Sequence, residues 1–144
     1  MKKKAKRNMK LGRGFTLIEL LVVLVILGLL AGLVGPRVLS YLGGAKSDTA
    51  RLQIEEFGAG LDLFYLETGR YPTTDEGLQA LVEQPSSVSN WHGPYLKKKD
   101  IPNDPWGREY HYQSPGENGP YDLFSYGMDG TEGGEDDNQD IVSW

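Results

Sequence analysis

The chain has 144 residues with no cysteine and two histidines, which excludes a disulfide framework and a thiolate nucleophile and leaves little for a polyhistidine metal centre. Its net charge of −5 is unevenly placed: residues 1–14 carry seven Lys or Arg and no acid, and residues 15–144 carry eight against twenty Asp or Glu. The long acidic part lacks the electrostatic pattern of a nucleic-acid-binding protein, so we expect no nucleic-acid partner.

An apolar run begins at residue 15 and ends at residue 34, with Glu19 as its single charge. Twenty helical residues span roughly 30 Å, the thickness of a bilayer's hydrocarbon core. The basic residues before the run place residues 1–14 in the cytosol and everything after about residue 36 outside. A cleaved secretory signal peptide is the first alternative, but no Ala-x-Ala site follows the run. A plain signal anchor is the second, and it leaves Glu19 unexplained, because a charge near a helix centre costs about 2.5–3.5 kcal/mol.

Residues 13–19, RGFTLIE, follow a basic leader and open the apolar run. This pattern resembles the class III signal of type IV pilins and of type II secretion pseudopilins. The resemblance implies that a prepilin peptidase cleaves between Gly14 and Phe15, removing residues 1–14, and methylates the new amine of Phe15. That amine and Glu19 are four residues apart, on one helix face. The resemblance also implies that Glu19 pairs with the Phe15 amine of a neighbouring subunit during filament assembly.

The helix is expected to continue from residue 15 to about residue 67, as a transmembrane and assembly part, residues 15–36, and an amphipathic part, residues 37–67. The apolar stripe of the second part consists of Val38, Leu42, Ala45, Leu52, Phe57, Leu61, Phe64 and Tyr65. The first part contains the helix-weakening residues Gly28, Gly32, Gly35 and Pro36. They indicate either close helix packing or a flexible segment, and the local unwinding of related filaments favours the flexible segment.

Residues 68–144 are expected to form a small globular part. Thr73 and Glu76 form a capping-box pattern that predicts a short helix ending near residues 84–85. Three strands are expected near residues 109–113, 121–126 and 141–144. The fold class is therefore α/β (α+β): a long N-terminal helix packed on a small antiparallel sheet, with a short second helix. The resemblance makes this a type IV pilin-like fold.

Three further segments, YPTTDEGLQAL, DPWGREYHYQSPG and YDLFSYGMDG, resemble the major pseudopilins of the type II secretion system. Many type IV pilins close their C-terminal region with a disulfide, which this chain cannot form. The resemblance implies a subunit that polymerises into a periplasmic pseudopilus and drives folded proteins across the outer membrane of a Gram-negative bacterium. The implied partners are copies of itself, minor pseudopilins, prepilin peptidase, and the inner-membrane assembly platform with its ATPase. The implied location is the inner membrane, with a single span and a periplasmic C-terminal domain.

An acidic loop, residues 129–140, holds six acids and no base. It is either a solvated loop or a calcium site, and its spacing does not fit an EF-hand. A small domain without disulfides needs another staple, and the loop lies between two expected strands. The resemblance implies calcium, with Asp129 as a ligand and with Tyr126 and Thr131 as carbonyl donors. The later ligand stays open among four residues: Asp136, Asp137, Asn138 and Asp140.

Catalytic patterns are weak, and we expect no enzyme. The nucleophile elbow G-x-S-x-G is absent, and the acids at residues 75 and 76 belong to a predicted helix N-terminus. The alternatives to a pseudopilin are a type IV pilin for adhesion, motility or DNA uptake and, from a different class, a membrane-anchored periplasmic enzyme.

Overall fold

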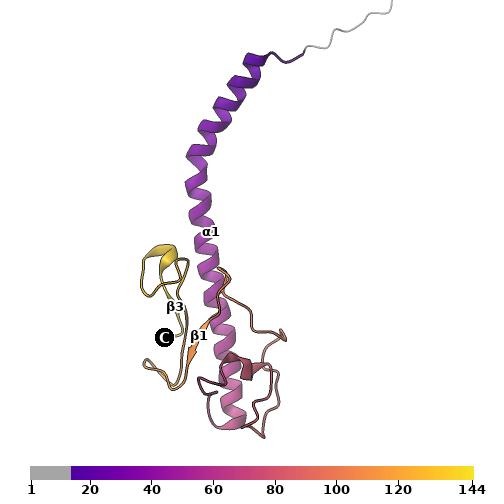
Figure 1. The fold of residues 1–144 in the computed structure, drawn as a ribbon, viewed down its shortest axis with the longest axis vertical. Helices are drawn as coiled ribbons and strands as arrows, with labels where there is room; N and C mark the ends of the chain where they lie inside the picture. Colours follow the sequence, from indigo (N-terminus) through magenta and orange to yellow (C-terminus); the bar gives the residue numbers. More distant parts are fainter. Residues whose placement is uncertain (1–13) are drawn as a thin grey trace, which may run out of the picture. The chain divides into compact units, whose positions relative to one another are not determined.

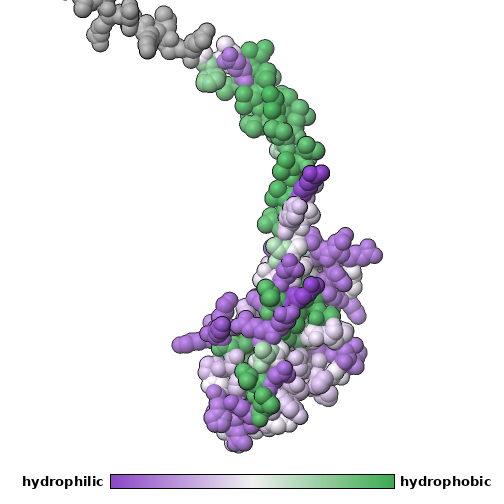
Figure 2. Space-filling view, turned by 180° about the vertical axis from the view of Figure 1, so that it is seen from behind, coloured by the Kyte–Doolittle hydropathy of each residue, from purple (hydrophilic) through white to green (hydrophobic). Residues whose placement is uncertain are grey.

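The computed structural model describes residues 14–144, so the expected leader lies outside the described residues except for Gly14. The chain divides into two compact units, and the boundary along the sequence lies between Val38 and Leu39. Helix α1, Leu17–Thr68, runs across this boundary, so each unit contains part of it (Figure 1). Among the described residues it is the one helix long and apolar enough to cross a membrane, with a mean hydropathy of 3.0 over its most apolar window. Apolar side chains cover its N-terminal stretch, whereas the C-terminal unit has a mainly polar surface (Figure 2).

Helix α1 begins at Leu17, two residues later than expected, because Thr16 and Glu19 form a capping box there. The Thr16 backbone N–H donates to Glu19 Oε2 at 2.9 Å, and the Glu19 N–H donates to Thr16 Oγ1 at 3.3 Å. The exchange satisfies two backbone donors that have no partner inside the helix. The expected helix weakness around Pro36 does not interrupt α1, which is helical through all four residues singled out in that region.

The C-terminal end of α1 depends on Gly69. Its φ of 79° is a left-handed conformation, and its N–H donates to the Tyr65 carbonyl at 2.8 Å. A glycine adopts this conformation without steric cost, so it ends the helix at Thr68, one residue beyond the expected position.

The second half of α1 supplies the core of the C-terminal unit. Its buried apolar residues are Ala50, Ile54, Phe57, Leu61 and Phe64, all at most 4 % exposed. Three positions of the expected stripe, Phe57, Leu61 and Phe64, lie in this core, whereas Leu42 and Leu52 are 56 % and 65 % exposed. The helix is therefore apolar on more than one side. The part of the C-terminal unit that packs on it, residues 69–144, which we call the head, covers only one of these sides.

Strands β1 His111–Gln113, β2 Asp122–Ser125 and β3 Ile141–Val142 form an antiparallel sheet in the order β1-β2-β3. The expected sheet is confirmed, with strands shorter than predicted. Phe124 lies opposite both His111 and Val142, so β2 is the central strand. Leu123 and Ile141 point into the core that α1 supplies, and the Tyr110 ring packs edge-on against Phe57 at 5.2 Å between centroids.

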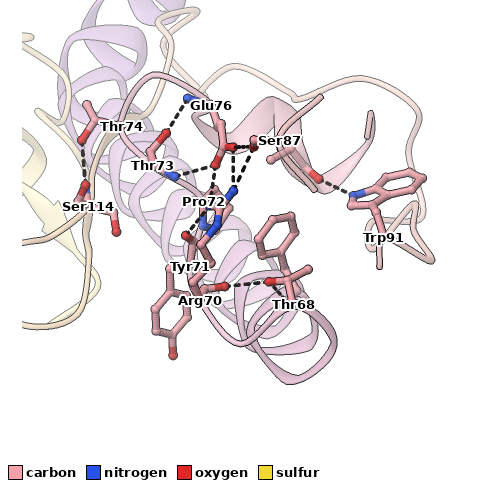
Figure 3. Close-up of polar contacts among 12 residues, drawn as sticks. Thr68, Arg70, Tyr71, Pro72, Thr73, Thr74, Glu76, Ser87, Trp91 and Ser114 are labelled. Carbon is pink, nitrogen blue, oxygen red and sulfur yellow. Dashed lines mark hydrogen bonds and ion pairs between the residues drawn. The ribbon is translucent and has the colours of Figure 1, made fainter. Parts of the chain in front are cut away.

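The expected capping box after α1 is confirmed, but the expected second helix is wrong in kind and length. Thr73 N–H donates to Glu76 Oε2 at 2.8 Å, and Glu76 N–H donates to Thr73 Oγ1 at 3.3 Å (Figure 3). The helix that follows is the four-residue 3₁₀ element η1, Leu78–Leu81. Gly77 is the cause: its φ of 58° and ψ of −165° lie outside any helix, so the turn cannot propagate.

Arg70 and Glu76 join the end of α1 to the turn before η1 (Figure 3). The Arg70 guanidinium donates two hydrogen bonds to the Glu76 carboxylate, at 2.7 and 2.8 Å. This pairing, with further donors from Ser87 and Thr73, lowers the pKa of Glu76 to about 2. Since the ordinary value is 4.5, the charged form is favoured by the fold.

We predict that Glu76→Gln lowers the stability of the head at neutral pH by about 1 kcal/mol, as expected for a partly exposed ion pair. The folded-state pKa is below the unfolded one, so the Glu76 contribution is complete above about pH 4.5 and is lost as pH falls toward 2. Thermal melting from pH 7 to pH 2 should show the wild-type and variant curves converging below pH 4.5. Glu109→Gln, which changes an exposed acid, is the control and should melt like the wild type at pH 7. A constant gap between Glu76→Gln and the wild type down to pH 2 would contradict the assignment.

Candidate functional site

Two regions hold the residues that the sequence analysis singled out: the start of α1 and the acidic loop. At the start of α1, the Phe15 side chain is 83 % exposed. Glu19 lies one turn along the helix, and its carboxylate accepts the Thr16 backbone N–H. Residues 16–19 have the S/T-x-x-E pattern of a capping box, which would have predicted this contact from the sequence. Glu19 therefore has a local role in the chain in addition to the assembly role that the resemblance implies.

The glycines in the first half of α1 leave free space beside the helix backbone. A Cβ placed at Gly28, Gly32 or Gly35 would meet no atom within 4 Å from the rest of the described chain, beyond its own turn of the helix. Small residues at such spacing let a second helix approach closely. Together with the exposed apolar side chains of residues 17–34, they make this stretch suited to lipid or to other helices, and the prediction of a flexible segment stays a prediction.

The acidic loop leaves β2 and returns to β3, and backbone contacts close its base. The Met128 N–H donates to the Asp137 carbonyl at 3.0 Å, which ties the outgoing arm to the returning one. Gly127 has a φ of 66°, and a Cβ there would lie 2.6 Å from the Gln139 carbonyl oxygen. A glycine is therefore required at this position, both for its backbone conformation and for the close approach of residue 139.

Two residues that the sequence analysis missed anchor the start of the loop. Buried Asp104 accepts the Arg108 N–H at 2.9 Å and the Ser125 hydroxyl at 2.6 Å. The Arg108 guanidinium donates to the carbonyls of Gly127 and Met128. The turn at residues 104–108, DPWGR, thus holds the end of β2 and the first loop residues in place. The signal was an Asp–Pro–x–Gly turn whose acid could satisfy backbone donors.

Asp129 and Asp140 lie in opposite arms of the loop. Asp129 Oδ1 accepts the Thr131 N–H at 3.0 Å, and Asp140 Oδ2 accepts the Gly133 N–H at 2.9 Å. The second oxygen of Asp140, Oδ1, is buried without a hydrogen-bond partner among the described residues. A buried carboxylate oxygen without a partner is costly, and a bound cation would remove that cost.

The other predicted ligands have different surroundings. Asp136 and Asn138 belong to the 3₁₀ element η2, Asp136–Asn138, and the Asp137 side chain lies against the backbone of Gly43 in α1. Thr131 is exposed, and the Tyr126 ring packs on His111 at 4.7 Å, so only the Tyr126 carbonyl could face a metal. Within residues 14–144, no three Asp, Glu or His side chains gather as a metal cluster. A cation here would therefore need backbone carbonyls besides Asp129 and Asp140, a donor set that suits a hard ion such as calcium.

Comparisons with known proteins first define the class. Residues 9–35 match the prokaryotic N-terminal methylation motif, and residues 37–144 match the model described as type II secretion system protein G. The type II secretion system core protein G of Pseudomonas aeruginosa is 49% identical over 135 residues, covering 91% of this chain and 94% of the relative. That of Vibrio cholerae is 43% identical over 141 residues, covering 96% of this chain and 95% of the relative.

A solved structure agrees with the sequence relatives. The crystal structure of the major pseudopilin from the type 2 secretion system of enterohaemorrhagic Escherichia coli matches with a TM-score of 0.58 and 34% identity. The match covers 70% of this chain and 88% of that one. The pilin-like fold expected from the sequence is thereby confirmed. The chain belongs to the type II secretion system protein G family.

We predict that Gly127→Ala destabilises the head more than Gly133→Ala does. Both glycines have positive φ, 66° and 90°, so an alanine at either position costs about 1–2 kcal/mol of folding free energy for a left-handed backbone. Only the alanine at residue 127 also meets the Gln139 carbonyl, because a Cβ at residue 133 has nothing within 4 Å. Chemical denaturation should give roughly 1–3 kcal/mol of additional loss at residue 127. Equal losses for the two variants would contradict the close packing of the loop base.

Proposed function

We propose that the chain is the structural subunit that polymerises into the periplasmic pseudopilus of a type II secretion system and so drives export of folded proteins across the outer membrane. The observation that carries the proposal is the succession of two family matches in one chain, the methylation motif at residues 9–35 and protein G at residues 37–144. A protein G match favours this function over a type IV pilin. The family is a structural one, which favours it over a membrane-anchored enzyme.

The proposed sequence of events begins in the inner membrane. The chain inserts once, with its basic leader in the cytosol and residues after about 36 in the periplasm. Prepilin peptidase then cleaves between Gly14 and Phe15 and methylates the new amine. The inner-membrane assembly platform and its ATPase add the mature subunit to a growing filament, together with minor pseudopilins. The methylation motif and the apolar start of α1 support these steps.

The filament is proposed to form through α1. Val38, Leu39 and Leu42 are 48 %, 69 % and 56 % exposed, and they follow a first half whose side chains are exposed throughout. Apolar surface of this extent is covered either by lipid or by other copies of the helix. In the filament, Glu19 of one subunit would pair with the Phe15 amine of its neighbour, and such a pair sets register more than it adds stability.

Calcium is proposed to bind in the acidic loop. The supporting features are the unpaired buried Oδ1 of Asp140, the exposed carboxylate of Asp129, and a loop base already closed by backbone contacts. Carbonyls such as those of Tyr126 and Thr131 would complete an oxygen-rich shell. The bound ion would neutralise the repulsion between the two arms, so that residues 129–140 and β3 stay folded on the core.

We predict that Glu19→Gln and Glu19→Ala both insert and are cleaved normally, because each removes a charge that opposes insertion. Both should lose filaments, since the neighbour's amine has no counter-charge. Intact mass should give a chain beginning with methylated Phe15 for wild type and both variants, and electron microscopy should count filaments. Glutamine still fits a capping box, so Glu19→Gln separates the two roles. Wild-type filaments from Glu19→Gln, with loss in Glu19→Ala, would assign Glu19 to helix capping and contradict the assembly role.

We predict that chelation lowers the melting temperature of the full chain in detergent. An ion that binds only the folded state at one hundred times its Kd adds roughly 2.7 kcal/mol of stability. Asp129→Ala and Asp140→Asn should melt low and respond little to calcium. Glu135→Gln removes an exposed acid from the same loop and should keep the calcium response. Identical wild-type curves with calcium and with chelator would leave residues 129–140 as a solvated loop.

A further inference from the structure

The outer side of the sheet carries rings and acids around one cavity of ≈ 210 Å³. We call it the acidic-aromatic face, and its defining residues are Glu117, Phe124, Tyr126, Glu132 and Trp144. Asp140 also lines the cavity but belongs to the proposed calcium site, so the free acids of the face are Glu117 and Glu132. The Phe124 ring lies 5.1 Å from Tyr126 and 6.0 Å from Trp144, and Trp144 is 54 % exposed. Phe124 also stacks on His111, with 5.0 Å between the ring centroids, so Trp144 is the exposed ring of this cluster, next to carboxylates.

Rings beside carboxylates recognise a cation on an aliphatic stem. The ring faces attract the charge, the carboxylates pair with it, and the apolar rings cover the methylenes. Among the described residues that line the cavity there is no Lys or Arg. The cation must therefore come from outside the face.

The lysine run, residues 97–99, is the matching surface on the same chain. All three lysines are exposed, and no hydrogen bond or ion pair holds them among the described residues. The other cations of the head's loops are engaged, Arg70 by Glu76 and Arg108 by two carbonyls. The lysine run is therefore the free positive patch of the loops in a head that is otherwise strongly acidic.

The two surfaces lie on different sides of the head. Figure 1 shows the acidic loop, in yellow, on one side of the outer half of α1 and the loop that follows η1 on the other side. They cannot meet within one head in this arrangement. A contact between two different patches on two copies is heterologous, and repetition of it produces an open helical polymer rather than a closed dimer.

We propose that the lysine run of one subunit docks on the acidic-aromatic face of an adjacent subunit in the filament. The inference rests on the chain being a filament subunit. Copies of an acidic head repel when they pack side by side, and a lateral contact between a basic and an acidic patch offsets that repulsion. Charge complementarity also fixes which side of one head meets which side of the next.

The test is site-specific disulfide formation in filaments of the full chain, which contains no cysteine of its own. Lys98→Cys is combined with Gln113→Cys, an exposed position lining the cavity. The matched control combines Lys98→Cys with Glu55→Cys, an exposed acid on α1. We expect oxidation to convert most of the Lys98/Gln113 variant into dimers and higher ladders, and to convert less than a tenth of either single variant.

Charge exchange gives a second readout. Changing all three lysines to Glu should lower filament yield at least fivefold, and adding Glu117→Lys and Glu132→Lys should restore at least half of it. Filaments without the 98–113 cross-link, or a ladder from the 98–55 pair instead, would overturn the docking proposal while leaving the filament function intact. Absence of filaments from the cysteine-free parent would instead contradict the proposed function itself.

Discussion

The burial of one side of the outer half of α1 is the interaction on which the rest of the structure depends. Phe57, Leu61 and Phe64 are at most 2 % exposed, and they pack with Leu81 from η1 and Leu123 from β2. The three short strands could not fold alone, since a small sheet needs an apolar partner. The helix that ends in this core is the same helix that begins in the apolar N-terminal stretch. One element therefore carries both the membrane anchor and the core of the head.

A chain of polar contacts extends this core to the acidic loop. Buried Asp104 fixes the turn before β1 and holds Ser125 at the end of β2, and Arg108 from the same turn holds the first loop carbonyls. The loop base is thus positioned by groups that need no metal. What the base leaves unsatisfied is Asp140 Oδ1, at the point where the chain turns into β3. A bound cation would complete an arrangement that these contacts already prepare.

The sequence predicted the elements well where a local pattern dominates. The apolar run and its continuation placed α1 to within two residues at each end, and the three strands lie within the ranges expected for them. It failed where a backbone angle or tertiary packing decides. Gly77 reads as an ordinary helix residue, but its extended, positive-φ conformation stops the second helix after the capping box. A helix that is apolar on more than one side gives no rule for which side its own head will bury, so Leu52 was placed in the same stripe as Phe57 and lies exposed.

The sequence predicted which loop holds the candidate metal ligands, but not how their side chains are arranged. Six acids in residues 129–140 mark the loop, but only the fold separates Asp137, turned onto Gly43, from Asp140 with its unpaired oxygen. The role of Arg108 in holding the start of the loop could not be predicted from the sequence, because the carbonyls that it binds are nineteen and twenty residues away. The capping pair at residues 16 and 19 was readable and adds a local reason for the carboxylate of Glu19.

Complementation tests the central claim most directly, that this chain is a pseudopilus subunit. A Pseudomonas aeruginosa strain lacking its own core protein G, which is 49% identical to this chain, would express the full chain, and secreted enzyme would be measured in the medium. The account predicts that secretion returns and that filaments containing this chain can be isolated. A chain that accumulates in the inner membrane, cleaved and folded, without restoring either secretion or filaments would contradict it.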